Sequence, residues 1–81
     1  MERKIKIGSK YKHFKGNLYE VIAIAYDSET NNELKPRKLV VYKALYGDGK
    51  VWVRDYEMFI SKVDKNKYPD IKQEYRFEEI N

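Results

Sequence analysis

The stretch Val40–Arg54, VVYKALYGDGKVWVR, decides the fold that this sequence predicts. It begins in a run from Leu39 to Tyr46 that is rich in β-branched and aromatic residues, and it ends in a second such run. Asp48-Gly49 lies between the two runs, and this dipeptide favours a tight turn because such turns need positive φ angles. The pattern therefore predicts a β-hairpin in which Trp52 and Arg54, two residues apart, share one face.

The sequence before this hairpin predicts a second one. Leu18–Tyr26 is apolar at both alternating sets of positions, which predicts a central strand covered on both faces. Lys10–Phe14 also alternates, and the turn signal Lys15-Gly16-Asn17 joins the two runs. Strict alternation places four residues of the longer strand on one face: Tyr19, Val21, Ala23 and Ala25.

The remaining segments are shorter. Asp27–Arg37 is polar and predicts a long loop in which Asp27-Ser28-Glu29-Thr30 can form a tight turn. Asp55 is a suitable cap for a short helical turn, and Phe59–Val63 then resumes an extended pattern. Tyr75–Ile80 predicts a last short strand.

Five or six short strands without a long helix predict an all-β protein. At this size, the ways to protect strand edges are a small SH3-like barrel or a strongly bent antiparallel sheet. We expect residues 1–81 to form a single β domain, with a basic N-terminal arm (1–8), a core (9–64) and a C-terminal strand or tail (65–81). The arm alternates only at Ile5 and Ile7, so it is either a short edge strand or a frayed end.

Composition narrows the class of protein. There are 17 Lys and Arg against 13 Asp and Glu, a net charge of +4, which favours anionic partners but also serves solubility. The chain has no Cys, which excludes disulfides and thiolate chemistry and fits a reducing cytoplasm. No apolar run approaches the ~20 residues needed to cross a bilayer. We therefore expect a cytoplasmic protein without a membrane partner.

The residues needed for catalysis are sparse. His13 is the single histidine, and the serines at 9, 28 and 61 have no nucleophile-elbow context. One histidine and scattered carboxylates give no metal-ligand spacing, and no phosphate-binding loop precedes a helix. The sequence predicts neither an enzyme, nor a metal site, nor a cofactor.

Binding chemistry is better represented. Aromatic rings stack on bases, Lys and Arg neutralise phosphates, and hydroxyls and carboxylates hydrogen-bond sugars. Residues of these types give the candidate ligand-binding set: Tyr11, His13, Lys15, Tyr19, Ser28, Glu29, Thr30, Tyr42, Trp52 and Arg54. Structural roles compete with binding, because tyrosines also pack on sheet faces and Arg54 can stack on Trp52 without a ligand.

These residues occur in blocks that resemble a known family. The blocks are Tyr11–Tyr19, Ser28-Glu29-Thr30, Val40-Val41-Tyr42 with Leu45-Tyr46, and Trp52-Val53-Arg54 with Met58-Phe59. In order and chemistry they resemble the small prokaryotic and phage family called domain of unknown function 1653. The resemblance spans about Tyr11 to Val63.

The resemblance supports the fold and implies a shared motif set, but it carries no activity. It implies that eight residues belong together: His13, Lys15, Gly16, Ser28, Glu29, Thr30, Trp52 and Arg54. Two features depart from the family pattern. Asp27 stands where the family usually has a His before Ser-Glu-Thr, and extra residues occur around Lys35–Lys38, where they would alter access to the site.

Three functions remain open. The leading one is a non-catalytic module that binds an anionic, nucleotide-like small molecule. A phage-type protein of this kind would sequester a nucleotide immune signal, commonly as a homo-oligomer with sites between subunits. The alternatives are a single-stranded nucleic-acid-binding β-barrel and a protein-interaction module that offers a groove or a free edge strand.

Overall fold

Five antiparallel strands, one single-turn helix and one 3-10 turn make up the part of the chain that the structure describes. We describe residues 4–30 and 34–80 of a computed structural model. The elements are β1 (Lys10–His13), β2 (Leu18–Tyr26), η1 (Ser28–Thr30), β3 (Lys38–Ala44), β4 (Val51–Asp55), α1 (Tyr56–Phe59) and β5 (Phe77–Ile80). The predicted all-β class and both hairpins are confirmed. None of the helices in the described ranges is long and apolar enough to cross a membrane.

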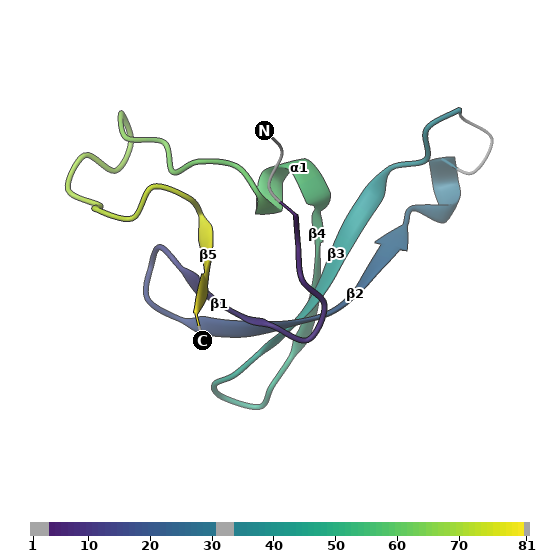
Figure 1. The fold of residues 1–81 in the computed structure, drawn as a ribbon, viewed down its shortest axis with the longest axis horizontal. Helices are drawn as coiled ribbons and strands as arrows, with labels where there is room; N and C mark the ends of the chain where they lie inside the picture. The colour runs from purple at the N-terminus through teal and green to yellow at the C-terminus, as the bar shows by residue number, and fades with distance from the viewer. Residues whose placement is uncertain (1–3, 31–33, 81) are drawn as a thin grey trace.

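The strands form one sheet in the order β4-β3-β2-β1-β5. Strand β2 is central, as predicted, and the last strand pairs with the first, with His13 opposite Phe77. Figure 1 shows that the sheet bends strongly, with β5 and β4 on opposite sides of the bend. Because β4 and β5 do not pair with each other, the sheet is open rather than a closed barrel.

An irregularity in β2 changes which of its residues face the core. Pairing with β3 shifts register between Val21 and Ala23, a β-bulge that adds one residue to β2. Ile24, rather than Ala23, therefore pairs with buried Val40 and packs against the core. The prediction that Ala23 and Ala25 share the face of Val21 was wrong, because strict alternation holds only without a bulge.

The β3–β4 hairpin has a longer connection than predicted. The strands end at Ala44 and begin again at Val51, and the N–H of Ala44 donates to the carbonyl of Lys50 at 2.9 Å. Within the described chain only glycines have positive φ, here Gly47 (60°) and Gly49 (69°), so Asp48 does not take the predicted turn conformation. The register pairs Tyr42 with Trp52 and Val40 with Arg54. Trp52 and Arg54 therefore share a face, as predicted.

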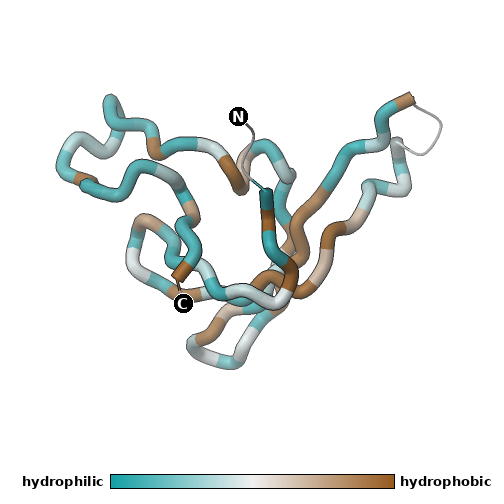
Figure 2. Tube along the Cα trace, viewed as in Figure 1, coloured by the Kyte–Doolittle hydropathy of each residue, from teal (hydrophilic) through white to brown (hydrophobic). Residues whose placement is uncertain are grey.

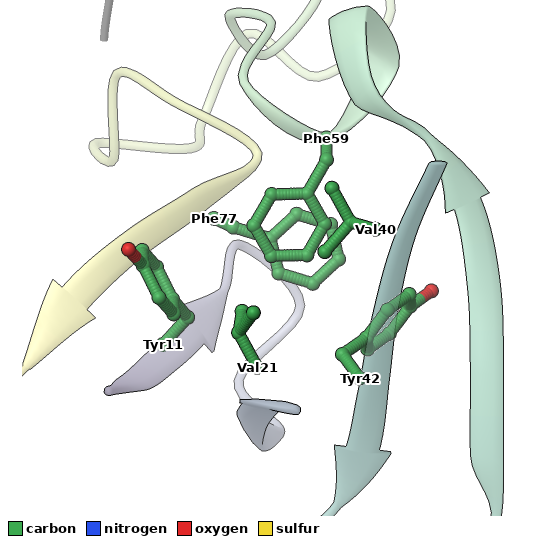
Figure 3. Close-up of a cluster of buried hydrophobic side chains, with 6 residues drawn as sticks. All are labelled: Tyr11, Val21, Val40, Tyr42, Phe59 and Phe77. Atoms are coloured by element: carbon green, nitrogen blue, oxygen red, sulfur yellow. The ribbon is translucent and has the colours of Figure 1, made fainter. Parts of the chain in front are cut away.

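The core lies on one face of the bent sheet. Its buried cluster consists of Tyr11, Val21, Val40, Tyr42, Phe59 and Phe77, with the ring of Phe59 over that of Phe77 (Figure 3). Helix α1 supplies Phe59, and the predicted cap is confirmed because the N–H of Met58 donates to Asp55 Oδ2 at 3.2 Å. On the opposite face Ile22 is 43% exposed, so the prediction that β2 is covered on both faces was wrong.

The two ends of the chain differ from the sequence predictions. Residues 4–9 form no strand; the N–H of Gly8 and the carbonyl of Ser9 bond to Val21 instead. The rest of the predicted arm, residues 1–3, lies outside the described residues. Between α1 and β5 the described chain has an isolated bridge from Lys62 to Tyr75 and no strand, so the extended run Phe59–Val63 is not a strand. Figure 2 shows that the segment between α1 and β5 is largely hydrophilic.

Candidate ligand-binding site

The turn between β1 and β2 fixes the position of His13. Its carbonyl accepts from the N–H of Gly16 at 2.8 Å, and its own N–H donates to Asn17 at 2.9 Å. The side chain takes part as well, because His13 Nδ1 accepts from the N–H of Lys15 at 3.2 Å. The neutral imidazole therefore carries its proton on Nε2, which leaves that atom as a donor.

Phe77 is the centre around which side chains from four strands gather. Its ring centroid lies 4.8 Å from that of His13, 5.5 Å from that of Tyr42 and 5.8 Å from that of Tyr19. The guanidinium carbon of Arg54 lies 5.5 Å from the same centroid, within range of a cation–π interaction. We call His13, Tyr19, Tyr42 and Arg54 around Phe77 the Phe77 cluster.

Two exposed aromatic residues extend the cluster toward solvent. The hydroxyls of Tyr19 and Tyr46 hydrogen-bond at 2.8 Å, and burial together with this bond raises the pKa of Tyr19 to about 12. Trp52 pairs directly with Tyr42 across β3 and β4, and it is 46% exposed. It therefore offers a ring surface beside Arg54 rather than a core contact.

The cluster is electropositive. Burial, and to a smaller extent the nearby charges of Arg54, Lys15 and Arg76, lower the pKa of His13 to about 4. Among residues 4–30 and 34–80, no carboxylate forms an ion pair with any of these three cations. Three positive charges thus act on one imidazole without a neutralising acid. Such a field attracts an anion.

The donors of the cluster are only partly used by the protein. Arg54 Nε donates to the hydroxyl of Tyr42 at 3.2 Å, which orients the guanidinium over Phe77. In the described part of the chain, Arg76 Nε is buried without a hydrogen-bond partner. Lys15 lies at the flank, with Nζ 5.8 Å from the Phe14 centroid and 5.7 Å from that of Tyr68. An acceptor-rich ligand would contact Arg54 and Lys15 directly, whereas the buried Nε of Arg76 would act on it through its charge.

The structure brings together six of the ten candidate residues: His13, Lys15, Tyr19, Tyr42, Trp52 and Arg54. Tyr11 is not among them, because its ring is 2% exposed and packs on Phe59 in the core. Its hydroxyl accepts from the N–H of Lys6 at 3.0 Å. Tyr11 thus supports the sheet beneath the cluster.

The other three candidates, Ser28, Glu29 and Thr30, lie at the far end of β2 (Figure 1). Tyr19 and Tyr26 are seven residues apart on this strand, a span of about 23 Å at ~3.3 Å per residue. The Thr30 hydroxyl donates to the carbonyl of Asp27 and accepts from the N–H of Arg37, both at 2.8 Å. These bonds join the two arms of the β2–β3 connection, so they give Thr30 a structural role.

A hollow of about 530 Å³ also lies at that far end, lined by Tyr26, Leu34, Lys35, Pro36, Arg37, Lys38, Asp55, Tyr56 and Glu57. The arginine that lines it is already paired, because Arg37 lies 3.0 Å from Asp55 and 3.6 Å from Asp27. A hydrogen bond from Arg37, more than its charge, holds the pKa of Asp55 below its usual value. We place the candidate site at the Phe77 cluster, whose cations are unpaired. The extra residues around Lys35–Lys38 line the hollow instead.

Sequence reasoning missed three residues of this site: Tyr46, Arg76 and Phe77. Arg76 and Phe77 belong to the alternating run that predicted the last strand, so the signal was present. What no local pattern showed is that β5 pairs with β1, which brings Phe77 opposite His13.

The comparisons with known proteins identify a family and leave the ligand open. No curated protein and no solved structure matches the chain. The family model described as "Protein of unknown function (DUF1653)" matches residues 9–79. This match includes every residue of the Phe77 cluster and extends past residue 64 into β5. The chain therefore belongs to the DUF1653 family.

Proposed function

We propose that this protein is a non-catalytic module that binds an anionic, nucleotide-like small molecule at the Phe77 cluster. The observation that carries the proposal is the positive charge of Arg54, Lys15 and Arg76 around the neutral His13, which no ion pair neutralises within the described chain. Exposed aromatic rings border these cations. Together they offer electrostatic attraction for phosphate and stacking for a base.

The contacts suggest a division of roles. Arg54 uses Nε for Tyr42, so its terminal nitrogens remain for a phosphate. Lys15 adds a second cation, and His13 Nε2 adds a neutral donor. Trp52 and Tyr46, 46% and 45% exposed, supply ring surface for the base. The proposal places the protein in the cytoplasm, where sequestration of a nucleotide signal would be its role.

A titration tests this proposal directly. Trp52 is the single tryptophan, so its fluorescence reports on the site when mononucleotides, cyclic nucleotides and ADP-ribose-type nucleotides are added separately. We expect a saturable change in fluorescence. The affinity should fall about tenfold or more in the Arg54→Gln variant, since charge-assisted hydrogen bonds contribute roughly 1.5–3 kcal/mol. Arg37→Gln is the matched control, because it removes the same group at the far end of β2. The proposal would be contradicted if no nucleotide changed the fluorescence, or if both variants lost the same amount of affinity.

A second candidate is binding of single-stranded nucleic acid. It is favoured by the position of the cluster on an open bent sheet, with Trp52 at the rim, where successive bases could stack. Salt separates the two candidates, because phosphate contacts along a strand release counterions and give a steep salt dependence. A fluorescence response to a short oligonucleotide that fades with salt, without response to nucleotides, would favour this function.

A further inference from the structure

Strand β4 is one edge of the sheet, and its register determines which groups point to the open side. The N–H of Ala44 bonds to the carbonyl of Lys50. Bonded and non-bonded pairs alternate in an antiparallel ladder, so the pairs Tyr42–Trp52 and Val40–Arg54 are also bonded. The N–H and C=O groups of Val51 and Val53 therefore point away from β3, toward the open edge.

This edge lacks two of the devices that usually prevent pairing, a proline and a bulge. Strand β4 contains no Pro and no bulge, and Val51, Trp52 and Val53 are 55%, 46% and 57% exposed. Exposed apolar edge strands with free backbone groups pair readily with another strand. The occupant of the edge must match both its hydrogen-bonding groups and its charges.

We propose that a second copy of this chain occupies the edge, pairing antiparallel through β4 about a two-fold axis at Val53. In this register Val53 lies opposite Val53 of the second copy, and Val51 lies opposite its Asp55. Trp52 of each copy lies opposite Arg54 of the other, on the core-side face. All five residues of β4 are then paired, and the two sheets of five strands become one sheet of ten.

Charge selects this register over its neighbours. A shift that sets Trp52 opposite Trp52 also sets Lys50 opposite Arg54, and a shift the other way sets Arg54 opposite Arg54. Directly opposed like charges destabilise a strand pair, whereas an aromatic ring opposite Arg stabilises it. Of these three registers, only pairing at Val53 places a cation opposite a ring twice and opposes no like charges.

The pairing would also complete the candidate site, a consequence that rests on the proposed function. Arg54 lies over Phe77 in its own copy, so the second copy's Trp52 would border the Phe77 cluster. Each ligand would then contact rings from both copies. An interface of one short strand is small, so we expect a dimer that dissociates on dilution.

Charged variants at position 53 test both the dimer and its register by sedimentation equilibrium over a range of protein concentrations. The wild-type protein should show a concentration-dependent dimer. Val53→Lys and Val53→Asp should each be monomeric, because identical charges face each other across the two-fold axis. An equimolar mixture should again form dimers, since Lys then faces Asp. Val51→Lys is the matched control: it faces the second copy's Asp55 and should retain the dimer.

Several outcomes would overturn the proposal: a wild-type monomer at all concentrations, a dimer of Val53→Lys as stable as the wild type, or no restoration in the mixture. Val53 is exposed in the single copy, so circular dichroism should show unchanged strand content in both variants. The mass measurements need no ligand, so their failure leaves the proposed function untouched. Where nucleotide binds the wild type, Val53→Lys should bind about tenfold more weakly, because one stacked ring is lost, and the mixture should recover affinity.

Discussion

The rings of Phe59 and Phe77 lie parallel, with centroids 4.0 Å apart and an interplanar angle of 7°. Phe59 comes from helix α1 and Phe77 from β5, so this contact joins the two segments that follow the β-hairpins. Both rings are almost fully buried. Phe77 also contacts His13 and Arg54, and it therefore connects the hydrophobic core to the candidate site.

The two phenylalanines should differ in their effect on the site. Phe77→Leu and Phe59→Leu each remove ring contacts from the core, and we expect each to lower the free energy of unfolding by about 1–2 kcal/mol. Only Phe77→Leu should move the pKa of His13, because, of these two phenylalanines, Phe77 is the one that packs against the imidazole. Urea denaturation and NMR titration of His13 measure the two effects. Equal effects on His13 would contradict the assignment of Phe77 as the link.

His13 should titrate far below an ordinary histidine. Burial and then the charges of Arg54, Lys15 and Arg76 lower its pKa to about 4. Arg54→Gln should raise this pKa toward 6.5, and Arg37→Gln should leave it unchanged. Because His13 is the single histidine, its ring-proton NMR signal reports the value without ambiguity. A wild-type pKa near 6.5 would show that the cations do not act on the imidazole.

The same shift predicts how stability depends on pH. Between pH 4 and pH 6.5 the unfolded chain protonates His13 and the folded chain does not. The contribution of neutral His13 is complete above pH 6.5 and is lost as the pH falls through this window. His13→Asn should make the unfolding free energy less dependent on pH there. Carboxylates such as Asp55 contribute equally to the unfolding free energies of wild type and variant, so subtracting one from the other isolates the contribution of His13.

The local patterns predicted the strands well and the long-range arrangement only in part. The hairpin between β3 and β4, the cap at Asp55 and the shared face of Trp52 and Arg54 follow from residues close in sequence. The bulge after Val21 could not be predicted in this way, because the sequence of the strand does not show where an extra residue interrupts the pairing. It moved Ile24 into the core and the two alanines out.

The candidate set divided for a related reason. Strand β2 separates Tyr19 from the turn at Ser28-Glu29-Thr30. Candidate residues that the sequence suggested as one set therefore lie at two ends of the sheet. Arg76 and Phe77 reached the site through the pairing of β5 with β1, two segments at opposite ends of the chain. Residue types indicated the chemistry of the site, whereas the order of the strands in the sheet determined which residues lie in it.

The turn that holds His13 depends on Gly16, whose φ is 108°. A methyl group at this position would meet nothing within 4 Å, so any cost of Gly16→Ala comes from the backbone. We expect a loss of about 1–2 kcal/mol, since residues with a Cβ rarely adopt this φ. Gly47→Asn is the control, because its φ of 60° suits Asn and should cost little. Thermal unfolding of both variants checks this, and equal losses would contradict it.

Thr30 should matter for stability and not for binding at the Phe77 cluster. Thr30→Val keeps the shape of the side chain but removes the hydroxyl that bridges the carbonyl of Asp27 and the N–H of Arg37. We expect a loss of about 1 kcal/mol, typical of an intramolecular hydrogen bond.

Urea denaturation measures this loss, and the Trp52 fluorescence titration should give wild-type affinity for the same ligand. Ser28→Ala is the comparison, because no hydrogen bond of its side chain is seen in the described structure, and it should change neither quantity. Weaker ligand binding by Thr30→Val at unchanged stability would instead place a second site at the far end of β2. The residues of the Ser-Glu-Thr motif would then act on a ligand there, independently of Arg54 and His13.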